Sequence, residues 1–174
     1  MKLIVVTGMP AAGKNIATEY AKKYQYPHFS TGDFVRAEIA RRGLSADPET
    51  SASISTQLRG TDGLGVTRMA VNEALKQRSD VVFLEGVRSW PEIELIRMTT
   101  PCRLVAVVAP RAMRMERIVH RGRADDSVFH FDQRDRREID YGVAVCIALA
   151  DDYVLNTGSI EDAMEQFDRI IQAI

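Results

Sequence analysis

The stretch that most constrains this chain is Gly8–Asn15, which reads Gly-Met-Pro-Ala-Ala-Gly-Lys-Asn. An apolar run over residues 3–6 precedes it, and a segment with helical spacing begins at Ile16. A glycine-bounded loop between a strand and a helix lets backbone N–H groups converge on an anion, and the helix N-terminus adds positive potential. Lys14 adds a mobile point charge for the outer phosphates. The pattern predicts a nucleotide-binding loop, against the alternative of an ordinary glycine-rich turn. The loop comprises Gly8, Met9, Pro10, Ala11, Ala12, Gly13, Lys14, Asn15 and Ile16.

One position departs from this pattern. The residue after the lysine is expected to be Ser or Thr, whose hydroxyl binds Mg²⁺, and this chain has Asn15 instead. An amide oxygen accepts a hydrogen bond or contacts a metal less tightly than a hydroxyl in that position. The pattern therefore predicts the phosphate cradle and leaves open whether Asn15 supports Mg²⁺.

Composition and net charge limit the classes of protein to which this chain can belong. The 174 residues predict a single domain over 1–174, and 45% hydrophobic with 27% charged residues are typical of a globular protein. A net charge of −1 argues against a general nucleic-acid or membrane-surface binder. Cys102 and Cys146 have no metal-ligand spacing, so we expect reduced thiols and a cytoplasmic location. No apolar run is long enough for a signal peptide or a membrane span.

Apolar runs over 3–6, 81–84 and 104–109 are typical of buried parallel strands, and shorter ones lie at 27–29 and 153–155. Segments with helical spacing separate them. This alternation predicts an α/β protein, a three-layer α/β/α P-loop NTPase fold with a parallel sheet of about five strands. Ligands of such sheets bind at the carboxyl ends of the strands, where the candidate motifs fall.

The remaining segments have less regular patterns. A helix is expected to follow Ser30 and to end near Gly43. A polar helical segment over 45–65, the polar excursion, is expected to lie above the site. A basic helix follows the strand at 104–109, and residues 122–133 form a polar stretch. Apolar spacing from Ile139 to Ala150 predicts one helix, and Ser159 is expected to cap the last one.

Two carboxylates, Asp33 and Glu85, come directly after predicted strands. A carboxylate at this position, beside a bound triphosphate, is expected to bind Mg²⁺ directly or through water. The alternatives are that Asp33 caps its helix and that Glu85 pairs with a nearby arginine.

Arginines form the second constellation. Arg114, Arg117 and Arg121 fall on one helix face, and more follow through residue 137. With Arg36 and Arg88 they could surround an anionic ligand facing the nucleotide, because phosphoryl transfer needs positive charge on the moving group. Aspartates interleave with them, so the alternative is a charged surface helix pair.

The motifs resemble those of adenylate kinases. Ser30-Thr31-Gly32-Asp33-x-x-Arg36 is similar to their monophosphate-binding motif, and Glu85-Gly86-Val87-Arg88 to their Asp-Gly-Phe-Pro-Arg segment. Over nearly the whole chain, the sequence resembles an archaeal-type family of adenylate-kinase-related P-loop proteins, often described as dephospho-CoA-kinase-like. Its segments appear here at 121–126, 134–138 and 148–151.

The resemblance implies a nucleoside-monophosphate-kinase-like fold with an acceptor-binding excursion over about 31–65 and a short lid over about 122–134. It implies that Lys14, Arg88, Arg117, Arg121, Arg123, Arg134 and Arg137 are catalytic. The implied acceptor site comprises Thr31, Gly32, Asp33, Arg36, Glu85, Gly86, Arg88 and Glu92. Asn156 and Gly158 would lie near the donor base. Glu92 stands where adenylate kinases have an adenine-reading glutamine, and a carboxylate cannot donate to a ring nitrogen.

These observations predict ATP- and Mg²⁺-dependent phosphoryl transfer to a small nucleotide-like acceptor, with AMP first among nucleoside monophosphates. A dephospho-CoA-kinase-like activity, an NTP hydrolase and a nucleotide sensor with little turnover remain alternatives. The sequence does not give the oligomeric state.

Overall fold

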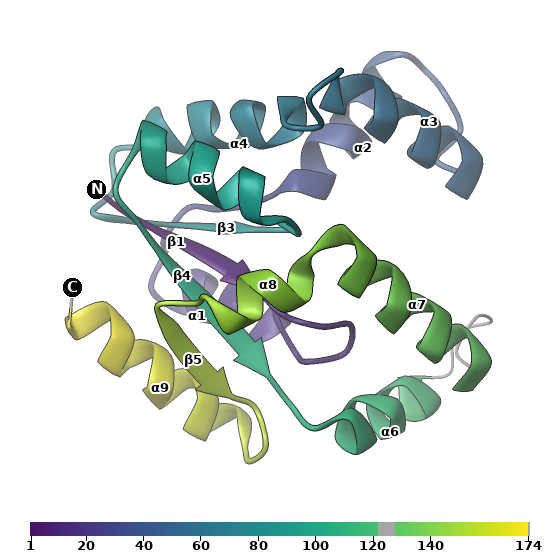
Figure 1. The fold of residues 1–174 in the computed structure, drawn as a ribbon. Helices are drawn as coiled ribbons and strands as arrows, with labels where there is room; N and C mark the ends of the chain where they lie inside the picture. The colour runs from purple at the N-terminus through teal and green to yellow at the C-terminus, as the bar shows by residue number, and fades with distance from the viewer. Residues whose placement is uncertain (122–127, 174) are drawn as a thin grey trace.

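The structure, a computed structural model, describes residues 1–121 and 128–173. As predicted, five strands of the described residues form one parallel sheet, and their order is β2-β3-β1-β4-β5 (Figure 1). The strands are β1 (Lys2–Thr7), β2 (His28–Ser30), β3 (Val81–Glu85), β4 (Cys102–Val108) and β5 (Asp152–Leu155). The first strand is therefore central, and the loop that follows it emerges in the middle of the carboxyl edge.

Helices cover both faces of the sheet. The helices of the described residues are α1 (Asn15–Lys23), α2 (Thr31–Arg41), α3 (Pro48–Arg59), α4 (Gly65–Leu75), α5 (Trp90–Thr99), α6 (Arg111–Arg121), α7 (Val128–Tyr141), α8 (Val143–Ala148) and α9 (Ile160–Gln172). No helix among the described residues combines the length and the apolar character that crossing a bilayer requires.

Alternate residues of β1 divide the core into two layers. Ile4 and Val6 pack in a cluster with α1 and α9, and Leu3 and Val5 pack in a second cluster with α4, α5 and α8. All four side chains are almost fully buried. A continuous apolar strand therefore has both faces covered, as a parallel sheet requires.

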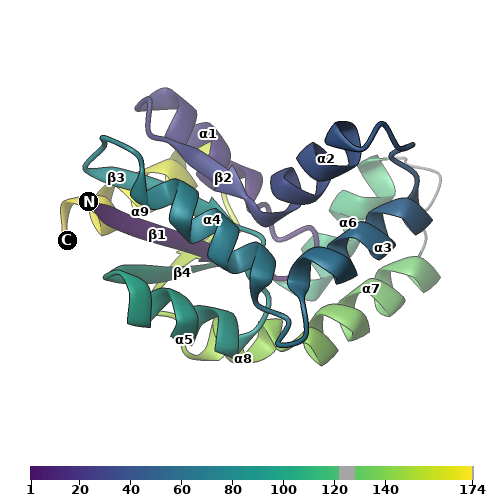
Figure 2. The ribbon, with the colours of Figure 1, turned by 90° about the horizontal axis from the view of Figure 1, so that it is seen from above.

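The helices that cover neither face of the sheet lie beyond its carboxyl edge. Helices α2 and α3 form one group and α6 and α7 another, and the two groups face each other across the end of β1 (Figures 1 and 2). The strand register aligns Val6 with Glu85 and Glu85 with Ser30, so the residues just after β1, β3 and β2 come to the same edge. This alignment explains why motifs distant in sequence form one site.

The structure corrects three sequence expectations. The single helix over 139–150 is two helices, because Gly142 has a φ of +103° that ends α7 and starts α8 at a new angle. Residues 128–133 of the polar stretch, for which no helix was predicted, are helical, since α7 begins at Val128. Helix α5 was not predicted, although Ser89 and Glu92 form a capping box at its start.

Other expectations hold. Ser159 caps α9 by accepting a hydrogen bond from the Asp162 amide. Helix α3 occupies the polar excursion. Cys102 and Cys146 are free thiols. The proposed lid at 122–134 lies partly outside the described residues, and its described part is the first turns of α7.

Candidate functional site

The loop between β1 and α1 has its shape because glycine stands near both ends. Gly8 has a φ of +152°, and a Cβ atom there would lie 2.4 Å from the carbonyl oxygen of Val107 in β4. Gly13 has a φ of +93°, and its Cβ would lie 2.0 Å from Nδ2 of Asn156. A side chain at either position would have to displace neighbouring atoms. Close approach of the loop to β4 and to the end of β5 thus requires both glycines.

Side chains from three parts of the chain bind the carbonyl oxygens of this loop. Lys14 Nζ donates to Gly8 at 2.7 Å and to Met9 at 3.2 Å. Arg114 and Arg117, both in α6, donate to Pro10 at 3.0 Å and to Ala11 and Ala12 at 3.3 Å. Asn156 donates its amide to Ala12 at 2.8 Å. The carbonyl oxygens of the loop therefore face cationic and amide side chains of the protein.

Several amide N–H groups of the loop differ from its carbonyl groups in having no partner. Those of Ala11, Gly13 and Lys14 donate to no acceptor in the described part of the chain. Unpaired N–H groups gathered in one turn attract an anion. With the positive end of α1 behind them, they form an anion-binding cradle whose carbonyl oxygens are already occupied.

The ammonium group of Lys14 lies in a cleft of about 220 Å³ between the loop and α7. Burial lowers the pKa of Lys14, and the carboxylates of Glu138 and Glu85 partly offset that effect. Predicted residues Gly86, Arg88, Arg134 and Arg137 also line this cleft. The cleft therefore joins the phosphate loop to charged residues of the opposite wall. We call it the transfer cleft.

Thr7 is a residue of the transfer cleft that sequence reasoning missed. Its side chain is 1% exposed, and its hydroxyl oxygen has no hydrogen-bond partner among the described residues. Buried hydroxyls are nearly always hydrogen-bonded, so an orphan one beside Lys14 is consistent with a ligand partner. The sequence shows the hydroxyl of Thr7, but only the packing of β1 shows that it is buried without a partner among the described residues.

A second cleft of about 110 Å³ lies between α2, α3 and the start of α5. It is lined by predicted residues Thr31, Gly32, Arg88 and Glu92, together with Ser55 and Arg59 of α3. We call it the acceptor cleft. Because Arg88 lines both clefts, the acceptor cleft opens beside the transfer cleft. A third cleft of about 310 Å³ has Asn15, Gly13 and Arg117 on its walls.

Asp33 and Arg36 interact mainly with each other. Asp33 Oδ2 accepts a hydrogen bond from the Ser30 amide as part of the α2 capping box, and Oδ1 accepts one from Arg36 at 2.5 Å. Burial alone would raise the pKa of Asp33, but these two hydrogen bonds outweigh burial and lower it. The structure therefore places Asp33 in the capping role that the sequence left as an alternative.

Glu85 ends β3 near Lys14, and its carboxylate lies 3.7 Å from Nε2 of His28; it forms no ion pair with an arginine of the described residues. One carboxylate suits Mg²⁺ held mainly by phosphates and water. No group of three or more metal-ligating side chains occurs in residues 1–121 and 128–173. Glu85 thus fits an outer magnesium ligand, whereas both oxygens of Asp33 are engaged.

The carboxylate of Glu92 is held on several sides. Oε1 accepts a hydrogen bond from the buried hydroxyl of Thr67 at 2.6 Å. Oε2 accepts bonds from the amides of Arg88 and Ser89 at 3.0 Å and from the Ser89 hydroxyl at 2.9 Å. Glu92 thus fixes the turn that carries Arg88, in addition to lining the acceptor cleft.

The structure assigns Arg117 and Asn156 to the loop. Both donate to loop carbonyls, and Arg117 Nη2 also donates to the Asn156 carbonyl at 2.8 Å. Ile16 is 4% exposed and packs in the core, so only its backbone belongs to the site. Gly158 lies exposed in the turn before α9. Arg123 and the side chain of Arg121 lie outside the described residues.

Arg114, which the sequence groups with Arg117 and Arg121 on one helix face, is buried against α7. Its side chain is 6% exposed and forms two hydrogen bonds with Asp135 of α7, at 2.7 and 2.6 Å. The arginine spacing in the sequence could not separate this residue from its neighbours, because burial depends on where α7 packs.

The fold and the loop together define a P-loop kinase-like α/β protein. Residues 7–132 match the protein family described as an AAA domain, so the chain belongs to that family. Among curated proteins, it is 40% identical to the UPF0200 protein MJ1399 of Methanocaldococcus jannaschii, over 100% of this chain and 91% of that protein. The chain is thus a member of the UPF0200 family.

Two solved structures share the fold at low sequence identity. TT1252 from Thermus thermophilus is 20% identical, with a TM-score of 0.69 over 98% of this chain and 96% of that one. Shikimate kinase from Aquifex aeolicus is 15% identical, with a TM-score of 0.57 over 99% of this chain and 97% of that one.

Proposed function

We propose that this protein is an ATP-dependent kinase that transfers a phosphoryl group to a small nucleotide-like acceptor, with AMP or another nucleoside monophosphate as the first candidates. One observation carries the proposal. Arg88 lines both the transfer cleft, which contains Lys14, and the acceptor cleft beside α2 and α3. A donor phosphate on the loop and an acceptor in the second cleft would therefore meet at this arginine.

The described residues would have different roles in phosphoryl transfer. The N–H groups of Ala11, Gly13 and Lys14, which have no acceptor among the described residues, would hold the donor phosphates together with the Lys14 ammonium. Arg88, Arg134 and Arg137 would place positive charge around the moving phosphoryl group, which is the main contribution a protein makes to this reaction. Arg117 would act by holding the loop in shape.

When bound, Mg²⁺ would supply positive charge that neutralises charge on the donor phosphates. Glu85 would hold it through water, and Asn15 would supply an amide oxygen in place of the usual hydroxyl. Asp33 would have to leave its helix cap to take part.

The experiment mixes purified protein with Mg·ATP and a panel of AMP, GMP, CMP, UMP and dephospho-CoA. Acceptor-dependent release of ADP supports the kinase, and release only with dephospho-CoA selects the alternative acceptor. Phosphate release without acceptor supports a hydrolase. Tight nucleotide binding with neither product supports a sensor, and absence of binding contradicts the whole proposal.

A hydrolase is the second candidate because Asn15 replaces the usual magnesium-binding hydroxyl and the acceptor cleft is polar and small. The Lys14→Ala variant should abolish turnover in either case. Only the kinase predicts that mutations of acceptor-cleft residues other than Arg88 change acceptor-dependent turnover and leave basal hydrolysis unchanged.

A further inference from the structure

Two arginines from distant parts of the chain contact the same aromatic ring. Arg59 ends α3, Arg88 follows β3, and Tyr141 ends α7. The guanidinium carbon of each arginine lies 5.9 Å from the centroid of the Tyr141 ring. A cation at this distance is attracted by the electrons of the ring face. Tyr141 thus holds two like charges near each other at the edge of the acceptor cleft.

Few carboxylates of the described residues neutralise Arg59 and Arg88. Arg88 pairs with Glu138 of α7 at 3.2 Å. Within the described residues, Arg59 has no carboxylate within ion-pair distance, although it is half-buried. The carboxylate of Glu92 in the same cleft accepts its hydrogen bonds from hydroxyls and amides. Among the described residues, the cleft therefore presents one guanidinium with a single carboxylate partner and a second with no carboxylate partner.

Arg36, which the adenylate-kinase resemblance assigns to the acceptor, is placed differently. Its side chain is 66% exposed and pairs with Asp33, and it is not among the residues that line the acceptor cleft. A ligand in that cleft would meet Arg59 and Arg88 instead.

We propose that Arg59 and Arg88 together bind the phosphate of the acceptor, a phosphomonoester dianion, and that Tyr141 is the positioning residue that holds both guanidinium groups for it. Two guanidinium groups match the charge of the dianion and offer planar pairs of donors to its oxygens. On binding, Arg88 exchanges Glu138 for the phosphate, so acceptor binding also releases a contact to α7. This inference rests on the proposed function.

The test compares acceptor affinity in matched variants. Calorimetry with each phosphomonoester of the panel gives binding without turnover, and ADP release gives the Michaelis constants for acceptor and ATP. Arg59→Ala should weaken acceptor binding by about tenfold to a hundredfold, because hydrogen bonds to charged groups are lost, and should leave the ATP constant unchanged. Arg36→Ala is the control and should change acceptor affinity less than Arg59→Ala.

Tyr141 needs a readout that separates positioning from folding. Tyr141→Leu should raise the acceptor Michaelis constant about two- to fivefold with little change in kcat, and Tyr141→Phe should behave as wild type because the ring is retained. Thermal unfolding of each variant checks that the fold is intact. A Tyr141→Phe defect equal to that of Tyr141→Leu would contradict the role of the ring.

The outcomes separate this inference from the proposed function. Turnover that is lost in Arg36→Ala and unchanged in Arg59→Ala overturns the inference and keeps the kinase. Phosphomonoester binding that depends on Arg59, without ADP release, keeps the inference and overturns the kinase. A wild-type protein that binds no member of the panel overturns both.

Discussion

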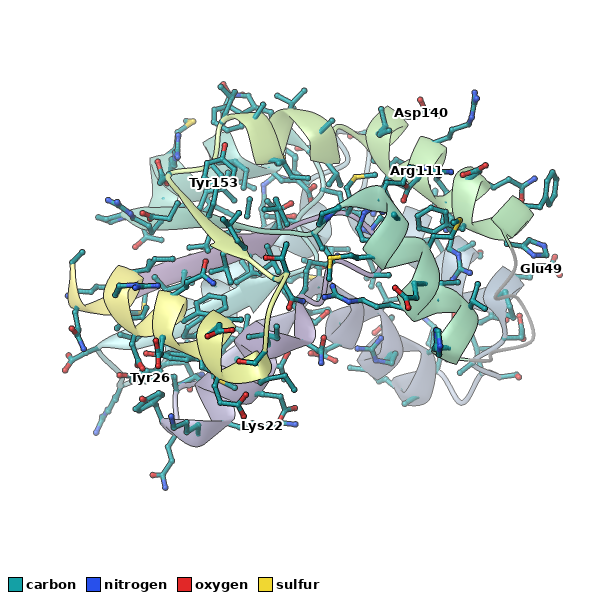
Figure 3. All side chains as sticks on the ribbon, turned by 90° about the horizontal axis from the view of Figure 1, so that it is seen from below. Lys22, Tyr26, Glu49, Arg111, Asp140 and Tyr153 are labelled. Atoms are coloured by element: carbon teal, nitrogen blue, oxygen red, sulfur yellow. The ribbon has the colours of Figure 1, made fainter. Side chains whose placement is uncertain are left out.

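Two ion pairs between α6 and α7 allow a direct measurement of what burial adds to a salt bridge. Arg114 pairs with Asp135, and Arg111 pairs with Asp132 one turn earlier (Arg111 is labelled in Figure 3). Both guanidinium carbons lie 5.2 Å from the Phe131 ring. The first pair is buried, with side chains 6% and 12% exposed, and the second is open, at 55% and 49%.

Removing Asp135 leaves a buried, uncompensated guanidinium next to the phosphate loop. Breaking a buried pair in this way costs about 3–5 kcal/mol, whereas an exposed pair is worth about 0–1 kcal/mol. For a domain of this size, Asp135→Ala should lower Tm by about 6–20 °C and Asp132→Ala by about 4 °C at most. Thermal unfolding followed by circular dichroism measures both.

A double replacement separates stability from function. Arg114→Leu with Asp135→Leu should restore most of the lost Tm, because an apolar pair of similar size is often as stable as a buried ion pair. It should still bind nucleotide more weakly, since the hydrogen bond from Arg114 to the Pro10 carbonyl is gone. Equal Tm losses for Asp135→Ala and Asp132→Ala would refute the reasoning from burial.

Four further predictions concern the site itself. Nucleotide affinity should fall as pH rises through the lowered pKa of Lys14, because the bound phosphates need its ammonium form. Calorimetry toward alkaline pH measures this loss, which should occur at higher pH in Lys14→Arg. Arg88→Ala should reduce acceptor-dependent turnover by at least about a hundredfold, and an unchanged rate would mean that the acceptor lies elsewhere. Thr7→Val should leave Tm equal or higher, because the hydroxyl has no partner in the described residues, while lowering nucleotide affinity; unaltered affinity would remove Thr7 from the site. Gly13→Ala should cost about 1–3 kcal/mol in unfolding free energy, measured with urea, because alanine is strained at a φ of +93° and its Cβ would meet Asn156.

The sequence was sufficient where a pattern is local. The strand before Gly8, the glycine-bounded loop and the serine cap of α9 all follow from neighbouring residues, and all are present. The helix expected over 139–150 failed because apolar spacing does not report that Gly142 adopts a positive φ. Spacing placed the apolar residues correctly on both sides of that glycine but missed the break between them.

The site was harder to predict because it depends on tertiary contacts. Motifs brought Lys14, Arg88 and Glu92 into consideration, and the clefts contain all three. Arg59 and Arg114 have no motif, and their surroundings exist only after α3, α6 and α7 have packed. Arg117 shows the converse, since its charge suggested contact with substrate while its hydrogen bonds go to the loop.

The bracing of the loop by Asn156 has a consequence for synthesis on the ribosome. The loop is translated within the first 15 residues, but the amide that binds the Ala12 carbonyl is 144 residues further along. A nascent chain that has exposed only β1 to β4 therefore lacks a brace that the finished loop possesses. The loop therefore acquires its full set of hydrogen-bonded supports only after the residues that follow the last strand have been synthesised.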